Sequence, residues 1–330
     1  MSDKEYSRRE FIKRNALAGI TATVGMGSSL SLLANLQPKV SSHLPNENEP
    51  IIDIHQHIHY SGRSDERLLA HQKAMGITTT VLLPSGRPVS SASTHYGFSN
   101  GLEAEAYGNE VCYKFAQAHP NEYTFGACEV PDVLGATAEI EKYLKLGAKV
   151  IGELKFGIEC DAKSMQKIYK LAEAYEVPVL MHWQFKKYNY HFEKFHKMLK
   201  KYPKVNFIGH AQTLWANVDK DHKDQSILYP KTKVTAGGLT DRLLSDYPNM
   251  FGDLSAGSGL NFFLRDEEHA KGFLQRHQDK LIYGSDCSDP VGHGPACQGS
   301  QTIIAIRRLS PNKAIERKLL FENAKRIFHL

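Results

Sequence analysis

Residues 51–57 read Ile51-Ile52-Asp53-Ile54-His55-Gln56-His57 and carry the clearest structural signal in this chain. Its apolar, β-branched start predicts a buried strand. Alternate side chains of a strand share one face, so His55 and His57 point the same way, about 7 Å apart along the backbone. Two imidazoles at that spacing can reach one metal ion. The stretch therefore predicts a strand with two metal ligands at its carboxyl end.

Later apolar runs carry side chains of the same chemistry at or near their carboxyl ends. These side chains are Glu153, His182, His210 and Asp286. Imidazole nitrogens and carboxylate oxygens from separate strand ends suit zinc or a similar divalent ion such as manganese. The chain therefore has the pattern of a metalloenzyme.

Eight strand-like runs alternate with amphipathic segments from residue 50 onward. The predicted strands are Ile51–His57, Thr78–Pro84, Tyr123–Val130, Lys149–Leu154, Val177–His182, Val205–His210, Met250–Leu254 and Leu281–Asp286. The predicted helices are Ser64–Met75, Gly101–His119, Gly135–Leu146, Ala162–Tyr175, Phe192–Tyr202, Thr240–Tyr247, Glu267–Gln278 and Ala314–Phe328. Eight such units in roughly 290 residues predict an α/β fold, the (β/α)₈ TIM barrel, with its metal site at the carboxyl-terminal face of the strands. An open doubly wound sheet is the alternative.

Three segments are predicted as long loops on the ligand-bearing face: Ser85–Asn100, Ala211–Gly238 and Cys287–Ser300. Long loops in barrels usually carry function, so we expect them to wall a substrate pocket. The loop residues considered for that pocket, each more readily explained by surface position or packing, are Arg87, Trp183, Trp215, Arg265 and His293. A loop arginine could bind a substrate carboxylate. The Gly- and Ser-rich stretch around Ser258 is predicted as a turn.

The composition permits one large domain and argues against a nucleic-acid partner. The 330 residues are 41% hydrophobic, and the formal net charge of +5 is spread along the chain. The densest basic stretch, Lys186–Lys201, is predicted as an amphipathic helix with a solvated basic face. Five cysteines without a CxxC motif do not form a disulfide framework. Cys287 and Cys297 share one predicted loop and could pair in an oxidising compartment.

The N-terminus carries a targeting pattern. Residues 7–13 read Ser-Arg-Arg-Glu-Phe-Ile-Lys and precede an uncharged stretch from Asn15 to Pro38. This resembles a twin-arginine (Tat) export signal, with Ile in place of Leu in the consensus. The resemblance implies recognition by the Tat export machinery, with a periplasmic or exported enzyme as the result. Residues 1–42 are therefore assigned to the signal and 43–330 to one barrel domain. Cleavage before His43 would leave no stable membrane contact, whereas retention would leave a membrane anchor.

The ordered set of ligands resembles one family. Asp53-x-His55-x-His57, followed by His182, His210 and Asp286, resembles the amidohydrolase superfamily, and most of all its "amidohydrolase 2" branch of barrel-fold, metal-dependent hydrolases and decarboxylases. The resemblance covers the chain from Pro50 to its end. It implies that His55, His57, His182 and Asp286 bind metal, and that His210 binds metal or acts on the substrate. Asp53 is expected to orient one of the histidines.

The fourth predicted strand leaves the number of ions open, at one or two. Glu153 and Lys155 lie two residues apart and so face the same way. Glu153 is predicted as a ligand because Gly-Glu-Leu-Lys resembles one version of the family's strand-four motif. Lys155 is either a bridging ligand or a neutralising partner of Glu153.

The family resemblance implies a hydrolase that acts on a C–O or C–N bond of a small molecule such as a lactone, ester or amide. A divalent ion would activate a water molecule, Asp286 would take and return its proton, and His210 or the ion would polarise the carbonyl. Non-oxidative decarboxylation of a small carboxylic acid is the alternative, and a non-catalytic exported binding protein is the third class. No GxSxG or P-loop motif is present, which argues against other catalytic schemes, and no GxGxxG follows the first strand, so no dinucleotide cofactor is expected. A homodimer remains open.

Overall fold

Eight short strands carry the fold in the computed structural model, which describes residues 49–84 and 108–330. The strands are β1 (Ile52–Gln56), β2 (Thr79–Leu82), β3 (Tyr123–Phe125), β4 (Ile151–Leu154), β5 (Val179–His182), β6 (Phe207–His210), β7 (Met250–Asp253) and β8 (Leu281–Ile282). All the predicted strands are therefore found, and each of them is shorter than predicted. The predicted signal, the Ser85–Asn100 loop with Arg87, and the start of the predicted helix at Gly101 lie outside the described residues.

The strands follow one another in chain order and pair in parallel. Ladder pairing groups them as β1-β2-β3 and β4-β5-β6-β7-β8. Backbone hydrogen bonds bridge the two seams: Ala127 donates to Val150 at 2.9 Å, and Asp286 donates to His55 at 2.7 Å. Since the β1 end contacts the segment after β8, the order is that of a barrel and not of a doubly wound sheet. The predicted (β/α)₈ fold is confirmed.

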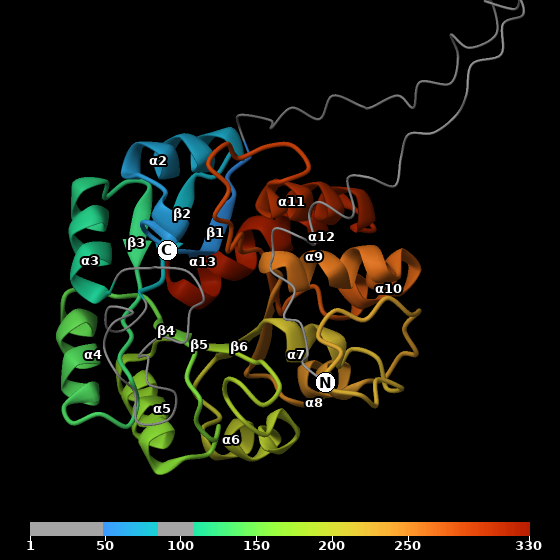
Figure 1. Cartoon of the computed structure of the whole chain (residues 1–330), viewed down its shortest axis with the longest axis horizontal. Helices are drawn as coiled ribbons and strands as arrows, with labels where there is room; N and C mark the ends of the chain where they lie inside the picture. The colour runs from blue at the N-terminus through green and yellow to red at the C-terminus, as the bar shows by residue number, and fades with distance from the viewer. Residues whose placement is uncertain (1–48, 85–107) are drawn as a thin grey trace, which may run out of the picture. The chain divides into compact units, whose positions relative to one another are not determined.

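Helices alternate with the strands and surround them in Figure 1. They are α2 (Asp65–Ala74), α3 (Asn109–Ala118), α4 (Ala136–Lys145), α5 (Lys163–Tyr175), α6 (His196–Lys201), α7 (Gln212–Ala216), α8 (Leu239–Asp246), α9 (Ala256–Arg265), α10 (Glu267–Arg276), α11 (Gln298–Leu309), α12 (Lys313–Arg317) and α13 (Asn323–Phe328). A π-helical turn, Lys318–Glu322, joins the last two within the predicted helix Ala314–Phe328. None of the described helices is long and apolar enough to cross a membrane.

The strand side chains form two apolar clusters. The larger packs the strands against the surrounding helices. The smaller joins strand residues such as Leu180 and Ile208 with Ile327 and Phe328 of α13. Residues two positions apart on a strand share a face, so His182 and His210 lie one layer above this apolar cluster. The apolar interior of the barrel therefore lies directly below the strand ends that carry these histidines.

The prediction of a turn around Ser258 is wrong, because α9 runs through it. Glycine weakens a helix, but a Cβ at Gly259 would lie 2.0 Å from the Leu254 carbonyl oxygen, so close packing requires glycine there. The predicted loops after β6 and β8 also contain helices: α7 in the first and the start of α11 in the second. Cys297 caps α11, its sulfur accepting the Ser300 amide at 3.4 Å. Cysteine is an uncommon cap, which explains why the sequence pattern did not indicate this helix.

Candidate metal centre

The structure brings the six predicted site residues together at one end of the barrel. They come from β1, β4, β5, β6 and the segment after β8, and all are buried: His55, His57, Glu153, His182, His210 and Asp286. Close packing of the strands makes this possible. A Cβ at Gly152 would lie 2.8 Å from the Leu180 carbonyl oxygen, so glycine before Glu153 allows β4 to approach β5.

Three imidazole nitrogens converge on two carboxylates without hydrogen bonding to them. The Nε2 atom of His57 lies 3.3 Å from Glu153 Oε2, and that of His55 lies 3.6 Å from the same oxygen. The Nε2 atom of His210 lies 3.6 Å from Asp286 Oδ2. These three nitrogens and Asp286 Oδ1 are buried and have no hydrogen-bond partner among the described residues. Buried polar atoms normally find partners, so an unpartnered group of this kind indicates a missing ligand.

Hydrogen bonds at the Nδ1 atoms of these three histidines determine which ring nitrogen keeps its lone pair. The Nδ1 atom of His57 lies 2.8 Å from the Leu83 carbonyl oxygen, which can only accept, so Nδ1 carries the proton. His55 Nδ1 lies 2.7 Å from Asp253 Oδ2, with the same consequence when that carboxylate is ionised. His210 Nδ1 lies 2.8 Å from the Ser255 hydroxyl. The Nε2 lone pairs of His55 and His57 are therefore free to bind metal.

Asp253 and Ser255 are the site residues that sequence reasoning missed. Asp253 Oδ2 accepts hydrogen bonds from both His55 and Ser255. Burial opposes ionisation of Asp253, but its interaction with His55 and the hydrogen bonds from His210 and His55 outweigh burial and hold the pKa of Asp253 below its usual range. The signal was present, since Asp253 lies at the end of a predicted strand, as the other site acids do.

Glu153 stands between two groups of histidines. Its Oε2 atom faces His55 and His57, and its Oε1 atom lies 2.6 Å from His182 Nδ1. Burial opposes its ionisation, but the interactions and hydrogen bonds with His182 and His55 lower the pKa of Glu153 well below its usual value. Lys155 does not neutralise this carboxylate: within the described residues no ion pair joins the two, and Lys155 Nζ lies 5.3 Å from the centre of the Tyr188 ring.

Burial, followed by the charge of Lys155, lowers the pKa of His182 to about 4, which keeps its ring neutral. A neutral imidazole is the form that binds metal. Among the described residues at this end of the barrel, donor atoms within 4.8 Å of one another form three groups: His55/His57/Glu153, His55/His210/Asp286 and Glu153/His182/His210. This donor set supports a divalent metal ion.

The expectation that Asp53 orients a histidine ring is wrong. Its Oδ1 atom accepts the backbone amides of His55 and Ser285, at 3.1 and 2.8 Å, and its Oδ2 atom accepts the Ser285 hydroxyl and Gln72. Hydrogen bonds of Asp53 therefore connect β1 with the segment that carries Asp286, whereas Asp253 orients the imidazole of His55.

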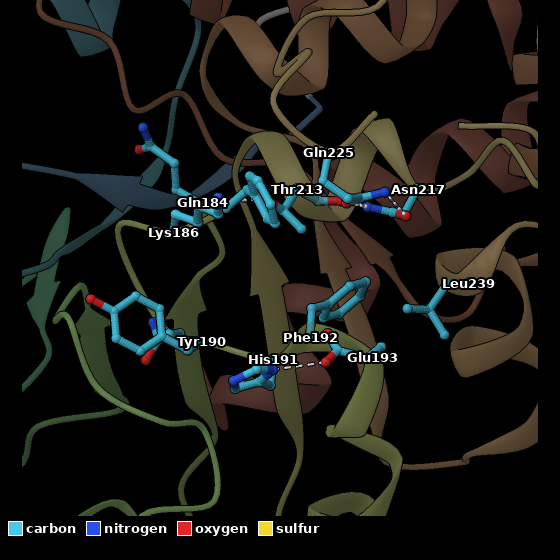
Figure 2. A pocket seen from close by; sticks show the side chains of 12 residues that line it. Gln184, Lys186, Tyr190, His191, Phe192, Glu193, Thr213, Asn217, Gln225 and Leu239 are labelled. Carbon is cyan, nitrogen blue, oxygen red and sulfur yellow. Dashed lines mark hydrogen bonds and ion pairs between the residues drawn. The ribbon is translucent and has the colours of Figure 1, made fainter. Parts of the chain in front are cut away.

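A cavity of about 650 Å³ lies in the loops after β5 and β6. Figure 2 shows Gln184, Thr213 and Gln225 in one row and His191 and Phe192 in another. Gln184 connects it with the centre, because its Oε1 atom lies 3.4 Å from His182 Nε2.

The other loop residues considered for a pocket have structural roles. Trp183 is buried against Phe192 and Phe195. Trp215 is buried and donates to the Asp253 carbonyl oxygen at 3.0 Å. Arg265 pairs with Asp219 at 2.6 Å, and His293 is exposed. The preference for packing and surface roles is confirmed for these four residues.

No protein-family model matches this chain, and no curated protein matches it. Solved structures do. An uncharacterised TIM-barrel protein from Bordetella bronchiseptica is 17% identical, with 85% of this chain and 98% of that chain covered and a TM-score of 0.57.

Two further matches have described activities. A probable 2-pyrone-4,6-dicarboxylic acid hydrolase from Acinetobacter baumannii is 14% identical, covering 85% of this chain and 99% of that one, with a TM-score of 0.54. A dihydroxybenzoic acid decarboxylase from Polaromonas, solved with manganese, is 13% identical, covering 86% and 97%, with a TM-score of 0.53. At these identities the similarity establishes the barrel fold.

Proposed function

We propose that this chain is a metal-dependent hydrolase of the amidohydrolase type, which cleaves a C–O or C–N bond of a small molecule such as a lactone, ester or amide. The observation that carries the proposal is the set of unpartnered, buried Nε2 atoms of His55, His57 and His210 around Glu153 and Asp286. The hydrolase among the matching structures lends support.

The metal would be held by His55, His57 and Asp286, with Glu153, His182 and His210 completing the site. Zinc suits this mixture of imidazoles and carboxylates, and manganese is bound in the Polaromonas decarboxylase. The Oε2 atom of Glu153 faces His55 and His57 and its Oε1 atom faces His182, so the two groups of donors that meet at this carboxylate would hold one ion or two.

The protein groups that would perform the reaction surround one point. When bound, the divalent ion supplies a Lewis acid that activates a water molecule. Asp286 takes the proton of that water and returns it to the leaving oxygen or nitrogen. His210, 3.6 Å from Asp286, polarises the scissile carbonyl or holds the ion. The substrate would occupy the cavity beside Gln184. The walls of this cavity are mainly apolar, and Gln184, Thr213 and Asn217 place amide and hydroxyl groups among them.

Decarboxylation of a small carboxylic acid is the second candidate, because several matching structures are dihydroxybenzoate decarboxylases. A panel of lactones, esters, amides and aromatic carboxylic acids would separate the two reactions. Hydrolysis releases acid from the first three classes, whereas decarboxylation releases CO₂ from the last. Metal content, measured on the protein and on His55→Ala, tests the shared premise. A folded protein that takes up no zinc or manganese would contradict both readings and leave a barrel that binds without catalysis.

We further propose that residues 1–42 direct export through the twin-arginine pathway. Ser7-Arg8-Arg9-Glu10-Phe11 supports this. A fusion of residues 1–42 to a folded reporter should reach the periplasm, and an Arg8→Lys, Arg9→Lys double variant should stay in the cytoplasm. Equal export of the two fusions would contradict the proposal. The mass of the exported reporter distinguishes a cleaved signal from a retained anchor.

A further inference from the structure

A second group of metal-binding side chains lies beside the segment that follows β8. His71 belongs to α2, Cys287 follows Asp286 directly, and Cys297 caps α11. All three are buried, and their donor atoms lie within 4.8 Å of one another. The reaction proposed above uses none of them.

The spacing of these atoms fits a tetrahedral ion. Cys287 Sγ lies 3.7 Å from Cys297 Sγ, which lies 3.6 Å from His71 Nε2. Zinc bonds of about 2.3 Å to sulfur and about 2.0 Å to nitrogen, at tetrahedral angles, separate two sulfurs by about 3.8 Å and a sulfur from a nitrogen by about 3.6 Å. The Met75 Sδ atom lies 3.7 Å from Cys297 Sγ, which places a thioether beside the group.

The chemistry of this group differs from that of the strand-end centre. Two thiols, an imidazole and a thioether form a soft donor set that selects zinc(II) or copper(I). The hydrogen bond from the Cys287 thiol, with further bonds from His71 and Ser300, lowers the pKa of Cys297 against the effect of burial. The His71 ring contacts Cys297 Sγ through its Nε2 atom, whereas its Nδ1 atom has no hydrogen-bond partner among the described residues.

We propose that His71, Cys287 and Cys297, with the Met75 thioether, bind a thiophilic metal ion at a site separate from the catalytic one. Such an ion would tie α2 to both ends of the 287–297 segment. It would also fix the position of Asp286, because Cys287 is its neighbour and the Gln298 side chain donates to the Asp286 carbonyl oxygen. The ion would thus hold the strand-eight carboxylate in place without touching the substrate.

Cobalt(II) titration of the reduced, metal-free, full-length protein tests this site. Cobalt bound to thiolate gives sulfur-to-metal charge-transfer absorption in the near ultraviolet, whereas cobalt bound only to imidazole and carboxylate does not. We expect the charge-transfer band in the wild-type protein, in His55→Ala, and in Cys112→Ser, a matched change of a buried cysteine elsewhere. Cys297→Ser should lose the band, and Cys287→Ala should lose or shift it. Zinc(II) or copper(I) should displace the cobalt, and the more effective of the two identifies the ion.

Three results would overturn the proposal. One is a wild-type protein, folded by circular dichroism, that binds cobalt without the charge-transfer band. Another is a band that persists in a folded Cys297→Ser variant. The third is a disulfide between Cys287 and Cys297, found in peptides of the protein as isolated, because oxidised sulfurs cannot serve as thiolate ligands. The catalytic proposal stands or fails separately, since His55→Ala leaves this site intact.

Discussion

Two polar clusters of this barrel differ in how completely their hydrogen-bonding groups find partners. At the carboxyl ends of the strands, the Nε2 atoms of His55, His57 and His210 face carboxylates without bonding to them. In the helix layer, Asp241 of α8 bonds His277 at 2.6 Å, Arg276 at 3.0 Å and a backbone amide at 3.2 Å.

The difference separates a functional cluster from a structural one. Removing a partner from a satisfied cluster costs stability, because it leaves a buried group without its hydrogen bond. Removing a group from the unsatisfied cluster should cost activity instead, because its atoms are held for a ligand that the fold does not supply. Substitutions in the two clusters can therefore test whether this difference separates activity from stability.

The largest expected effect is that of Asp286→Asn. Its carboxylate is assigned the proton transfer, and general-base catalysis contributes about 10²–10⁴-fold. Asparagine keeps the shape and tolerates the left-handed backbone of this residue, whose φ is 41°. We therefore expect kcat to fall about 10²–10⁴-fold while the melting temperature of the metal-free protein stays unchanged. Asp279→Asn, at a surface ion pair, is the control. A large loss of stability would place Asp286 with the structural cluster.

Asp253→Asn should have the next largest effect. The carboxylate of Asp253 holds the His55 ring, and such supporting partners are worth about 10–100-fold in metal affinity or activity. We expect metal affinity to fall by that factor and activity to return when metal is supplied in excess. Metal titrations monitored by activity and by calorimetry measure both. Activity that excess metal does not restore would mean that Asp253 acts in another way.

Gly284→Ala tests whether packing positions the same ring. A Cβ at Gly284 would lie 2.8 Å from His55 Cβ and 2.7 Å from Asp253 Oδ1. We expect this overpacking to cost about 1–3 kcal/mol and to lower metal affinity. Gly257→Ala is the matched control, because its nearest neighbour would be 3.6 Å away. Chemical denaturation and metal titration of both variants measure the effects. Equal stability and equal metal affinity of the two variants would show that packing at Gly284 does not position the His55 ring.

Sequence periodicity predicts the repeated features of this fold, which are the strands and the ligand-type residues at their carboxyl ends. Apolar runs indicated every strand, and ligand-type residues at their ends indicated His182, His210 and Asp286. These inferences work because the strand ends of a barrel meet at one face, so position along each strand fixes position in space.

Contacts between distant segments could not be inferred in this way. Asp53 was expected on a histidine ring and instead joins Ser285, whereas Asp253 reaches His55 across 198 positions of sequence. The alternation of side chains along a strand predicts which face a residue occupies. It does not predict which residue of another strand that side chain contacts. The start of α11 at Cys297 was missed for a related reason, since its cap forms with a side chain that is uncommon at that position.

The smallest expected effect is that of Asp241→Asn, which should change stability and its dependence on pH and leave activity alone. Burial opposes ionisation, but the His277 hydrogen bond and the charge of Arg276 lower the pKa of Asp241 from 3.8 to about 2. Because the folded-state pKa is the lower one, the stabilisation is complete above about pH 4 and is lost as the pH falls from about 4 to about 2. We expect the variant to be less stable by about 1–2 kcal/mol at pH 7 and to differ little from the wild type near pH 2. Urea unfolding at several pH values measures this. A difference that stayed constant with pH would show that hydrogen-bond geometry, and not the charge of Asp241, stabilises the helix layer.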